Sequence, residues 1–250
     1  MNISDLTTGE RPTWCPGCAN FVTLAAIKKA LIELHSEGMI DIDKTVIVSD
    51  IGCGAKIYDY LNINGFYALH GRVIPTAIGI KVGNPELNVI GFGGDGGTYD
   101  EGMSHLVHAS RTNPGITMMV ANNRVFALTK GQSTSSDSPI TNPLSIAAVS
   151  GAGFIARGSS TDLDHLSSLM KEAISHKGFS LLEIMQPCII FRNDGVDIAE
   201  KMEMIAKPKE PNFGKNIDRL HTKDGRLPIG IFRKEERPSL EDLMRYDPKG

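Results

Sequence analysis

Three oxygen donors suited to a divalent cation follow two consecutive predicted strands. The apolar run at residues 89–92 predicts a buried strand, and the glycine-rich turn directly after it contains Asp95. A second apolar run at 116–121 predicts the next strand, which leads to Asn123 and Val125. Mg²⁺ prefers an octahedron of oxygen ligands. The Asp95 carboxylate, the Asn123 amide oxygen and the backbone carbonyl of Val125 can supply three of them.

The same turn also fits a dinucleotide fingerprint, because a G-x-G-x-x-G pattern starting at Gly91 follows a predicted strand and precedes a helix expected over 100–111. A dinucleotide site needs an acidic residue at the end of the next strand, where this chain has Asn122 and Asn123. Asp95 also lies inside the turn, where its carboxylate would repel a diphosphate unless a cation lay between them. We therefore favour a diphosphate bound through Mg²⁺, with a nicotinamide-binding module as an alternative.

Four cysteines form a second set of residues with a chemical use. A tight turn with a Pro-Gly centre separates Cys15 from Cys18, Cys53 lies between two glycines, and Cys188 follows a predicted strand. Four thiolates suit a structural zinc ion or a [4Fe–4S] cluster. Zinc sites usually contain two close cysteine pairs, which this spacing lacks. A redox dithiol at Cys15 and Cys18 and unliganded thiols are the other interpretations.

The order of the predicted elements determines where these residues meet. Strands and helices alternate between residues 45 and 185, which predicts an α/β fold with a doubly wound, mostly parallel sheet. Parallel strands share one carboxyl edge, where ligands bind. The side chains expected along that edge are Asp50, Cys53, Asp95, Asn123 and Cys188. We expect strands at 45–49, 89–92, 116–121, 153–157 and 179–185, and helices at 21–34, 74–82, 100–111, 143–150 and 162–176, the last capped by Thr161.

Residues 191–250 differ in composition from the rest of the chain. Charged residues are dense there, and Pro and Gly recur. We expect only two short helices in this part, near 198–205 and 239–244. The chain therefore divides into a ligand-binding domain at 1–190 and a C-terminal extension at 191–250, which packs on the domain or on a partner subunit.

The bulk properties argue against several classes of protein. The 250 residues are 41% hydrophobic, enough for one sizeable α/β domain or two small ones. A formal net charge of −3 gives no electrostatic case for binding nucleic acid or an anionic membrane. The first twelve residues are polar, unlike a signal peptide, and no apolar run reaches membrane-spanning length. We expect a cytoplasmic protein whose cysteines are not a disulfide framework.

Several motifs together resemble a known family. Gly94-Asp95-Gly96 followed by Asn122-Asn123 resembles the thiamine diphosphate motif of thiamine-dependent enzymes. Over most of residues 10–190 the sequence resembles the β subunit of 2-oxoacid:ferredoxin oxidoreductases, and residues 228–238 resemble the C-terminal segment of that subunit. The further motifs that carry the resemblance are Cys15-Pro-Gly-Cys18, Gly52-Cys53-Gly54, His70-Gly71-Arg72 and Leu128-Thr-Lys-Gly-Gln132. A small departure is Ala19, where many members have Gly.

The resemblance implies a reaction and its partners. The reaction is oxidative decarboxylation of a 2-oxoacid with thiamine diphosphate and Mg²⁺, with coenzyme A as acyl acceptor. Electrons pass through one [4Fe–4S] cluster to ferredoxin. In this family the glutamate that the cofactor needs comes from an α subunit, or from a fused α/γ subunit. A non-oxidative thiamine-dependent decarboxylase or synthase is the alternative, although such an enzyme has no need of four thiolates.

The resemblance also implies roles for individual residues. The cluster would be held by Cys15, Cys18, Cys53 and Cys188, and Mg²⁺ by Asp95, Asn123 and Val125. The catalytic residues would be Lys130 and Leu128, which face the 2-oxoacid, and His70. The expected cofactor-binding residues are Asp50, Gly52, Lys56, His70, Gly71, Arg72, Gly94, Asp95, Gly96, Gly97, Asn123, Val125 and Phe126.

Overall fold

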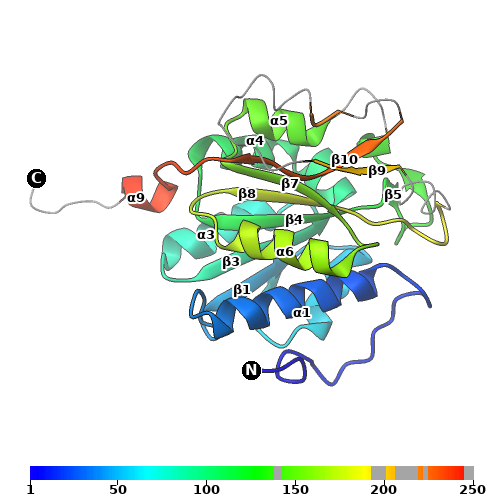
Figure 1. The fold of residues 1–250 in the computed structure, drawn as a ribbon, viewed down its shortest axis with the longest axis horizontal. Helices are drawn as coiled ribbons and strands as arrows, with labels where there is room; N and C mark the ends of the chain where they lie inside the picture. Colours follow the sequence, from blue (N-terminus) through cyan, green and yellow to red (C-terminus); the bar gives the residue numbers. More distant parts are fainter. Residues whose placement is uncertain (138–141, 193–200, 206–218, 222–224, 245–250) are drawn as a thin grey trace, which may run out of the picture.

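A computed structural model describes residues 1–137, 142–192, 201–205, 219–221 and 225–244. Within these residues, eight strands form one sheet in the order β2-β1-β3-β4-β8-β7-β10-β9 (Figure 1). The first six in that order are parallel, so their carboxyl ends lie along one edge. Their bounds are β2 Asn64–Tyr67, β1 Thr45–Ser49, β3 Asn88–Gly94, β4 Ile116–Asn122, β8 Ser180–Met185 and β7 Phe154–Ser159.

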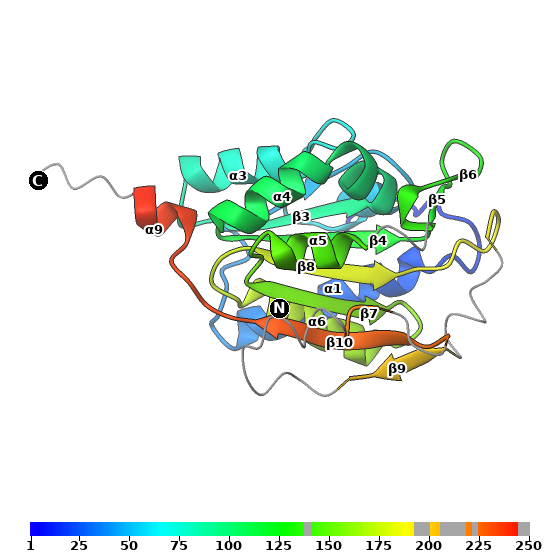
Figure 2. The same ribbon diagram turned by 90° about the horizontal axis from the view of Figure 1, so that it is seen from above.

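Helices cover both faces of the sheet (Figures 1 and 2). One face packs against α1 (Asn20–Ser36), α2 (Ile57–Tyr60) and α6 (Leu163–Ile174), and the other against α3 (Val73–Gly83), α4 (Met103–Thr112) and α5 (Pro143–Val149). Each face has its own cluster of buried apolar side chains, since a doubly wound sheet is buried on both sides. The predicted fold class is confirmed. No helix among the described residues has both the length and the apolar character needed to cross a bilayer.

Most predicted elements between residues 20 and 185 are present with small shifts of their ends. The strand at 45–49 is observed with the predicted bounds. The helix expected over 100–111 is different at its start, because a π-helical segment, η2 (Gly96–Glu101), precedes α4. The predicted cap of α6 was also wrong. Asp162, not Thr161, is the N-cap, and its carboxylate accepts the backbone N–H of His165 at 3.0 Å.

The C-terminal part contributes strands that the sequence reading missed. β10 (Leu227–Lys234) pairs antiparallel with β7, and β9 (Met202–Met204) pairs parallel with β10. The helix expected near 198–205 is therefore wrong at Met202–Met204, and residues 193–200 lie outside the described part. The second expected helix is present as α9 (Leu240–Met244), with the hydroxyl of Ser239 accepting the backbone N–H of Asp242.

Candidate active site

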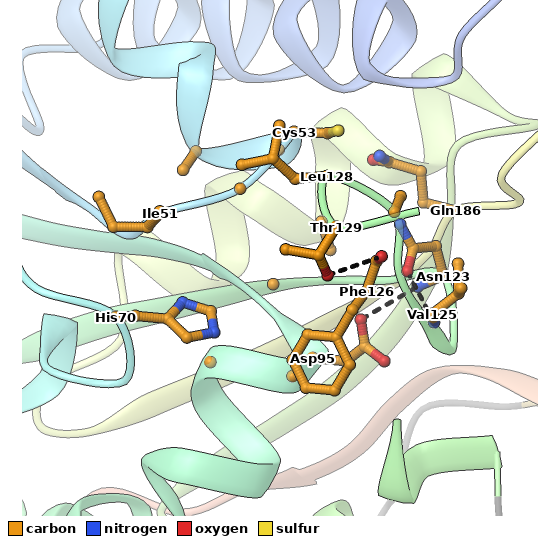
Figure 3. A pocket seen from close by; sticks show the side chains of 18 residues that line it. Ile51, Cys53, His70, Asp95, Asn123, Val125, Phe126, Leu128, Thr129 and Gln186 are labelled. Carbon is orange, nitrogen blue, oxygen red and sulfur yellow. Dashed lines mark hydrogen bonds between the residues drawn. The ribbon is translucent and has the colours of Figure 1, made fainter. Parts of the chain in front are cut away.

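The carboxyl ends of the parallel strands surround a cavity of about 230 Å³ (Figure 3). Segments that follow β1, β3, β4 and β8 form its wall. The structure thus brings together residues that are far apart in the sequence, as the shared strand edge predicted. The predicted site residues that line the cavity are Gly52, Cys53, His70, Gly94, Asp95, Gly96, Gly97, Asn123, Val125, Phe126 and Leu128.

Asp95 is a buried carboxylate held only by uncharged donors. Its side chain follows β3 directly and is 2% exposed. Its Oδ2 accepts hydrogen bonds from the hydroxyls of Thr134 at 2.5 Å and Ser136 at 2.6 Å, and its Oδ1 accepts the backbone N–H of Asn123 at 3.5 Å. Burial raises the pKa of Asp95, and these hydrogen bonds lower it in part. Among the described residues, no Lys, Arg or His forms an ion pair with it.

The glycines around Asp95 have no side chain where any other residue would place a Cβ atom. A Cβ atom on Gly96 would lie 2.2 Å from the Phe126 ring, and one on Gly97 would lie 1.9 Å from Oδ2 of Asp50. Both positions therefore require glycine to let the turn pack this closely. Gly94 differs, because a Cβ there would meet nothing within 4 Å. The backbone of Gly94 lines the cavity, so a ligand can approach it closely.

Asn123 and Val125 both line the same cavity. The loop between β4 and β5 (Val125–Phe126) turns at Arg124, whose φ of 59° is in the left-handed region. The amide oxygen of Asn123 accepts the Val125 N–H at 3.0 Å, and the Val125 carbonyl accepts the Ala127 N–H at 2.9 Å. Each of these oxygens has a second lone pair free for a further partner.

His70 lines the cavity and is oriented by Asp50. The fully buried carboxylate of Asp50 accepts hydrogen bonds from the backbone N–H of Ile51 at 2.7 Å and of Gly71 at 3.2 Å, and it contacts His70 Nδ1 at 3.1 Å. The other ring nitrogen, Nε2, lies 3.5 Å from the carboxylate of Glu101. Burial raises the pKa of Asp50, and the neighbouring His70 opposes that shift. Asp50 itself does not line the cavity but acts on it through the ring.

The four cysteines are free thiols that influence one another. The pKa of Cys53 is raised first by burial and further by Cys18, Cys188 and Cys15, while Lys56 opposes the shift. The indole of Trp14 donates a hydrogen bond to the Cys53 carbonyl at 2.6 Å, which holds the N-terminal segment beside this loop. Within the described residues, no three His, Cys, Asp or Glu side chains are placed to hold one metal ion.

Several predicted site residues lie outside the cavity wall. Lys130 is exposed and has a φ of 75°. Lys56 donates to the hydroxyl of Thr13 at 2.9 Å, and Arg72 donates to the Gly71 carbonyl at 3.2 Å. The predicted residues that do not line the cavity are Cys15, Cys18, Asp50, Lys56, Gly71, Arg72, Lys130 and Cys188.

The structure adds residues that the sequence reading did not select. Gln186 lines the cavity directly after β8 and joins it to α1, since it donates to the Asn20 side chain at 2.5 Å and accepts from the Thr23 hydroxyl at 2.9 Å. Its position after a predicted strand was a usable signal. Thr134 and Ser136 gave no such signal, because they reach Asp95 from a segment about 40 residues further along the chain.

Comparison with known proteins defines the class. A family of thiamine pyrophosphate enzymes, described by their C-terminal TPP binding domain, matches residues 50–184. This match covers more than half of the chain and contains β2, β3, β4, β7 and most of β8, together with every residue that lines the cavity except Gln186. The chain therefore contains a TPP-binding domain with the fold described above.

Whole-chain relatives narrow the family further. The 2-oxoacid:ferredoxin oxidoreductase 1, subunit beta, of Aeropyrum pernix is 40% identical over 247 residues, with 88% of this chain and 76% of the relative covered. The corresponding β subunit of a Sulfolobus species is 36% identical, with 93% and 85% covered. The chain belongs to the family of 2-oxoacid:ferredoxin oxidoreductase β subunits. It is thus a subunit of an oxidoreductase, as the motifs predicted.

A solved structure supports the same family. The 2-oxoglutarate:ferredoxin oxidoreductase from Magnetococcus marinus, with 2-oxoglutarate, coenzyme A and succinyl-CoA bound, has a TM-score of 0.90 to this chain at 28% identity. The alignment covers 98% of this chain and 88% of that one. The likeness therefore extends over β9 and β10 as well as over the TPP-binding part. The non-oxidative alternative and the nicotinamide-binding alternative are not favoured.

Proposed function

We propose that this chain binds thiamine diphosphate in an enzyme that oxidatively decarboxylates a 2-oxoacid, with coenzyme A as acyl acceptor and ferredoxin as electron acceptor. The observation that carries the proposal is Asp95, a buried carboxylate without a cationic partner among the described residues, next to a glycine turn that opens on a cavity. The reaction class is taken from the names of the relatives. The position of the cofactor is inferred from the Asp95 carboxylate.

A magnesium ion fits the donor set around Asp95. The site has one anionic oxygen and two neutral oxygens, from Asn123 and the Val125 carbonyl, each with a free lone pair. Hard oxygen donors of this kind are those that Mg²⁺ prefers, with the remaining positions filled by phosphate oxygens and water. A cation would also offset the charge that burial now makes unfavourable on Asp95. We therefore assign Asp95, Asn123 and Val125 as the magnesium ligands.

The remaining wall residues suit the cofactor and the substrate. When bound, thiamine diphosphate supplies the electron sink that decarboxylation requires. Gly94 leaves the space that a diphosphate needs, while Asp50 fixes the ring of His70, which also lines the cavity. Leu128, which is 51% exposed, lines the cavity and is assigned to contact with the substrate, and Lys130, two residues further along the same loop, is assigned to the substrate carboxylate.

Cys15, Cys18, Cys53 and Cys188 are assigned to a [4Fe–4S] cluster. In such a cluster each cysteine binds a different iron, so the sulfurs stand farther apart than around a single ion. This agrees with the described thiols, in which the charges of the other cysteines help to raise the pKa of Cys18 and of Cys53 but no three of the sulfurs are placed around a single ion. The cluster would supply a one-electron acceptor beside the cavity, since Cys53 belongs both to this set and to the cavity wall.

A second subunit is needed to complete the site. No glutamate is among the residues that line the cavity in the described part of the chain, although the cofactor needs one at its aminopyrimidine ring. Apolar side chains on segments that border the cavity are exposed, Ile51 at 47% and Leu69 at 78%. Such a surface suits burial against another protein. We assign it to the α or fused α/γ subunit and expect no turnover by this chain alone.

The test is an assay of the co-purified complex. Methyl viologen reduction is measured with pyruvate, 2-oxoglutarate and branched 2-oxoacids, with and without coenzyme A, thiamine diphosphate and Mg²⁺. We expect reduction that depends on all three additions and is lost in Asp95→Asn. Ser168→Ala on the distant helix α6 is the matched control and should behave as the unaltered complex does. Activity without a 2-oxoacid, or turnover by the purified β chain, would contradict the proposal.

A further inference from the structure

A continuous set of buried and partly buried polar contacts joins Asp95, at the end of β3, to β7, which is three positions away in the sheet. Arg157 on β7 contacts Glu183 on β8 at 2.5 Å, and the Asn122 amide at the end of β4 donates to the other Glu183 oxygen at 2.8 Å. The Ser136 hydroxyl lies 3.2 Å from the Asn122 amide oxygen and 2.6 Å from Asp95 Oδ2. The contacts therefore run from Arg157 through Glu183, Asn122 and Ser136 to Asp95.

The ion pair between Arg157 and Glu183 contributes little net stability, because burying both charges costs desolvation energy. Arg157 is 5% exposed and Glu183 is 2% exposed. Arg157 also donates to the Pro228 carbonyl at 3.2 Å, and its guanidinium lies 5.6 Å from the Phe232 ring centroid. Removing two charges from water offsets most of their mutual attraction, so apolar residues of similar volume would serve stability equally well. A role in geometry is a better account of the pair.

Glu183 determines which way the Asn122 amide points. An ionised carboxylate only accepts hydrogen bonds, so the NH₂ group of Asn122 must face it. The amide oxygen then points to the opposite side, where it accepts the Arg124 N–H at 3.1 Å and faces Ser136. Glu183 also lies near Tyr99 of η2, where its charge adds to burial in raising the pKa of the phenol.

We propose that Glu183 is a positioning residue for the metal-binding carboxylate, acting on Asp95 through Asn122 and Ser136. This inference rests on the proposed function, because it requires Asp95 to hold Mg²⁺. Groups behind a metal ligand orient it, and their replacement commonly weakens metal binding by about 10- to 100-fold. Glu183 lines no part of the cavity, so it would act without touching cofactor or substrate.

The decisive variant is Glu183→Gln in the co-purified complex. A glutamine amide can present either its NH₂ group or its oxygen, so Asn122 is no longer held in one orientation. We expect the dissociation constant of thiamine diphosphate, measured by calorimetric titration at fixed Mg²⁺, to rise about tenfold or more. Raising the Mg²⁺ concentration should restore saturation, because the defect lies in holding the metal. An unchanged dissociation constant would overturn the inference.

Two controls separate positioning from general loosening of the fold. Leu169→Ala removes a buried side chain of α6 that takes no part in these contacts, and it should lower stability without changing the dissociation constant. Asn122→Ala breaks the connection while leaving Arg157 and Glu183 paired, and it should weaken binding as Glu183→Gln does. Tight binding by Asn122→Ala, or weak binding by Leu169→Ala equal to that of Glu183→Gln, would overturn the inference.

A double-mutant cycle tests the connection itself. If Glu183 acts through Ser136, then Glu183→Gln adds little once Ser136→Ala is present, and the effects do not multiply. Fully multiplicative effects would show that the two residues act independently and would overturn the inference. If the unaltered complex shows no Mg²⁺-dependent binding of thiamine diphosphate, the proposed function itself fails, which is a different outcome from failure of the variants alone.

Discussion

Asp95 and Glu183 are two carboxylates with the same exposure, 2%, but they differ in whether a positively charged side chain pairs with them. Glu183 has an arginine at 2.5 Å, whereas the partners of Asp95 within the described part of the chain are the hydroxyls of Thr134 and Ser136 and the backbone N–H of Asn123. The cavity adjoins Asp95 and not Glu183. The difference indicates that the protein itself supplies the positive charge that pairs with Glu183, where the structure must be rigid. At Asp95, a bound cation would supply it.

A third buried titratable group, His176, has neither an ion-pair partner among the described residues nor a position beside the cavity. His176, at the amino end of the sheet, is 7% exposed, and neither of its ring nitrogens has a hydrogen-bond partner among the described residues. Burial lowers its pKa to about 4, so the ring is neutral at pH 7 and needs no counter-charge. The three groups give distinct predictions for stability and binding.

Breaking the pair between Arg157 and Glu183 should have the largest effect. Arg157→Met leaves the Glu183 charge buried and unpaired, and we expect the free energy of unfolding to fall by about 3–5 kcal/mol. Arg157→Met combined with Glu183→Leu should recover most of that loss in urea unfolding followed by circular dichroism. A double variant as unstable as the single one would show that the pair itself stabilises the fold.

His176 should make the fold sensitive to acid. Its pKa is about 4 in the folded state and about 6.5 when unfolded, so between these values the unfolded chain binds a proton that the folded chain does not. The free energy of unfolding should therefore fall as the pH drops from about 7 to 4, by up to about 3 kcal/mol, and the His contribution should level off below that. His176→Leu should remove this part of the acid sensitivity in urea unfolding at several pH values.

Asp95→Asn should separate binding from stability. The loss of the one carboxylate among the proposed metal ligands should weaken Mg²⁺-dependent binding of thiamine diphosphate about 100-fold, roughly 2.7 kcal/mol. Without ligands, the same change should raise the free energy of unfolding by about 1 kcal/mol, because a neutral amide replaces an uncompensated buried charge. Calorimetric titration and urea unfolding measure the two effects. A variant that loses stability and binding together would contradict the comparison.

Gly94→Ala should have the smallest effect, and only on binding. A methyl group there meets no protein atom, and φ is not in the left-handed region, so stability should change by less than about 1 kcal/mol. The methyl group projects into the space assigned to the diphosphate, so binding should weaken about tenfold. Gly79→Ala in α3 also meets no atom and lies away from the cavity, which makes it the matched control.

Local patterns were sufficient for the parallel part of the sheet except β2, which was not predicted. The apolar runs that became β1, β3, β4 and β8 are short, bounded by turn residues, and alternate with helical patterns. Because parallel strands end at one edge, the same patterns also placed Cys53, Asp95 and Asn123 around one cavity, although Asp50 and Cys188, expected on the same edge, do not line it. Asp162 displaced Thr161 as a helix cap because both types can cap, and sequence alone does not rank neighbours one residue apart.

Contacts between distant segments were beyond local reasoning. β10 contains Pro228 and Gly230, which argue against a strand when read alone, and its stability comes from pairing with β7 about 75 residues earlier. Thr134 and Ser136 were missed for the same reason, since nothing in a Ser/Thr-rich loop specifies which carboxylate it will meet. Lys130 was selected from its motif, and the described conformation of its loop leaves it outside the cavity wall.

The late position of the antiparallel strand β10 in the sequence affects how the sheet folds during synthesis. It covers the outer side of β7, and its Ile231 and Phe232 are buried at 7% and 1% exposure. During synthesis, β7 and β8 are complete long before residue 227 emerges, so β7 is for a time an unprotected edge able to recruit other chains. A version shortened to residues 1–190 would keep that edge permanently, and we expect it to aggregate at concentrations where the full chain remains dispersed.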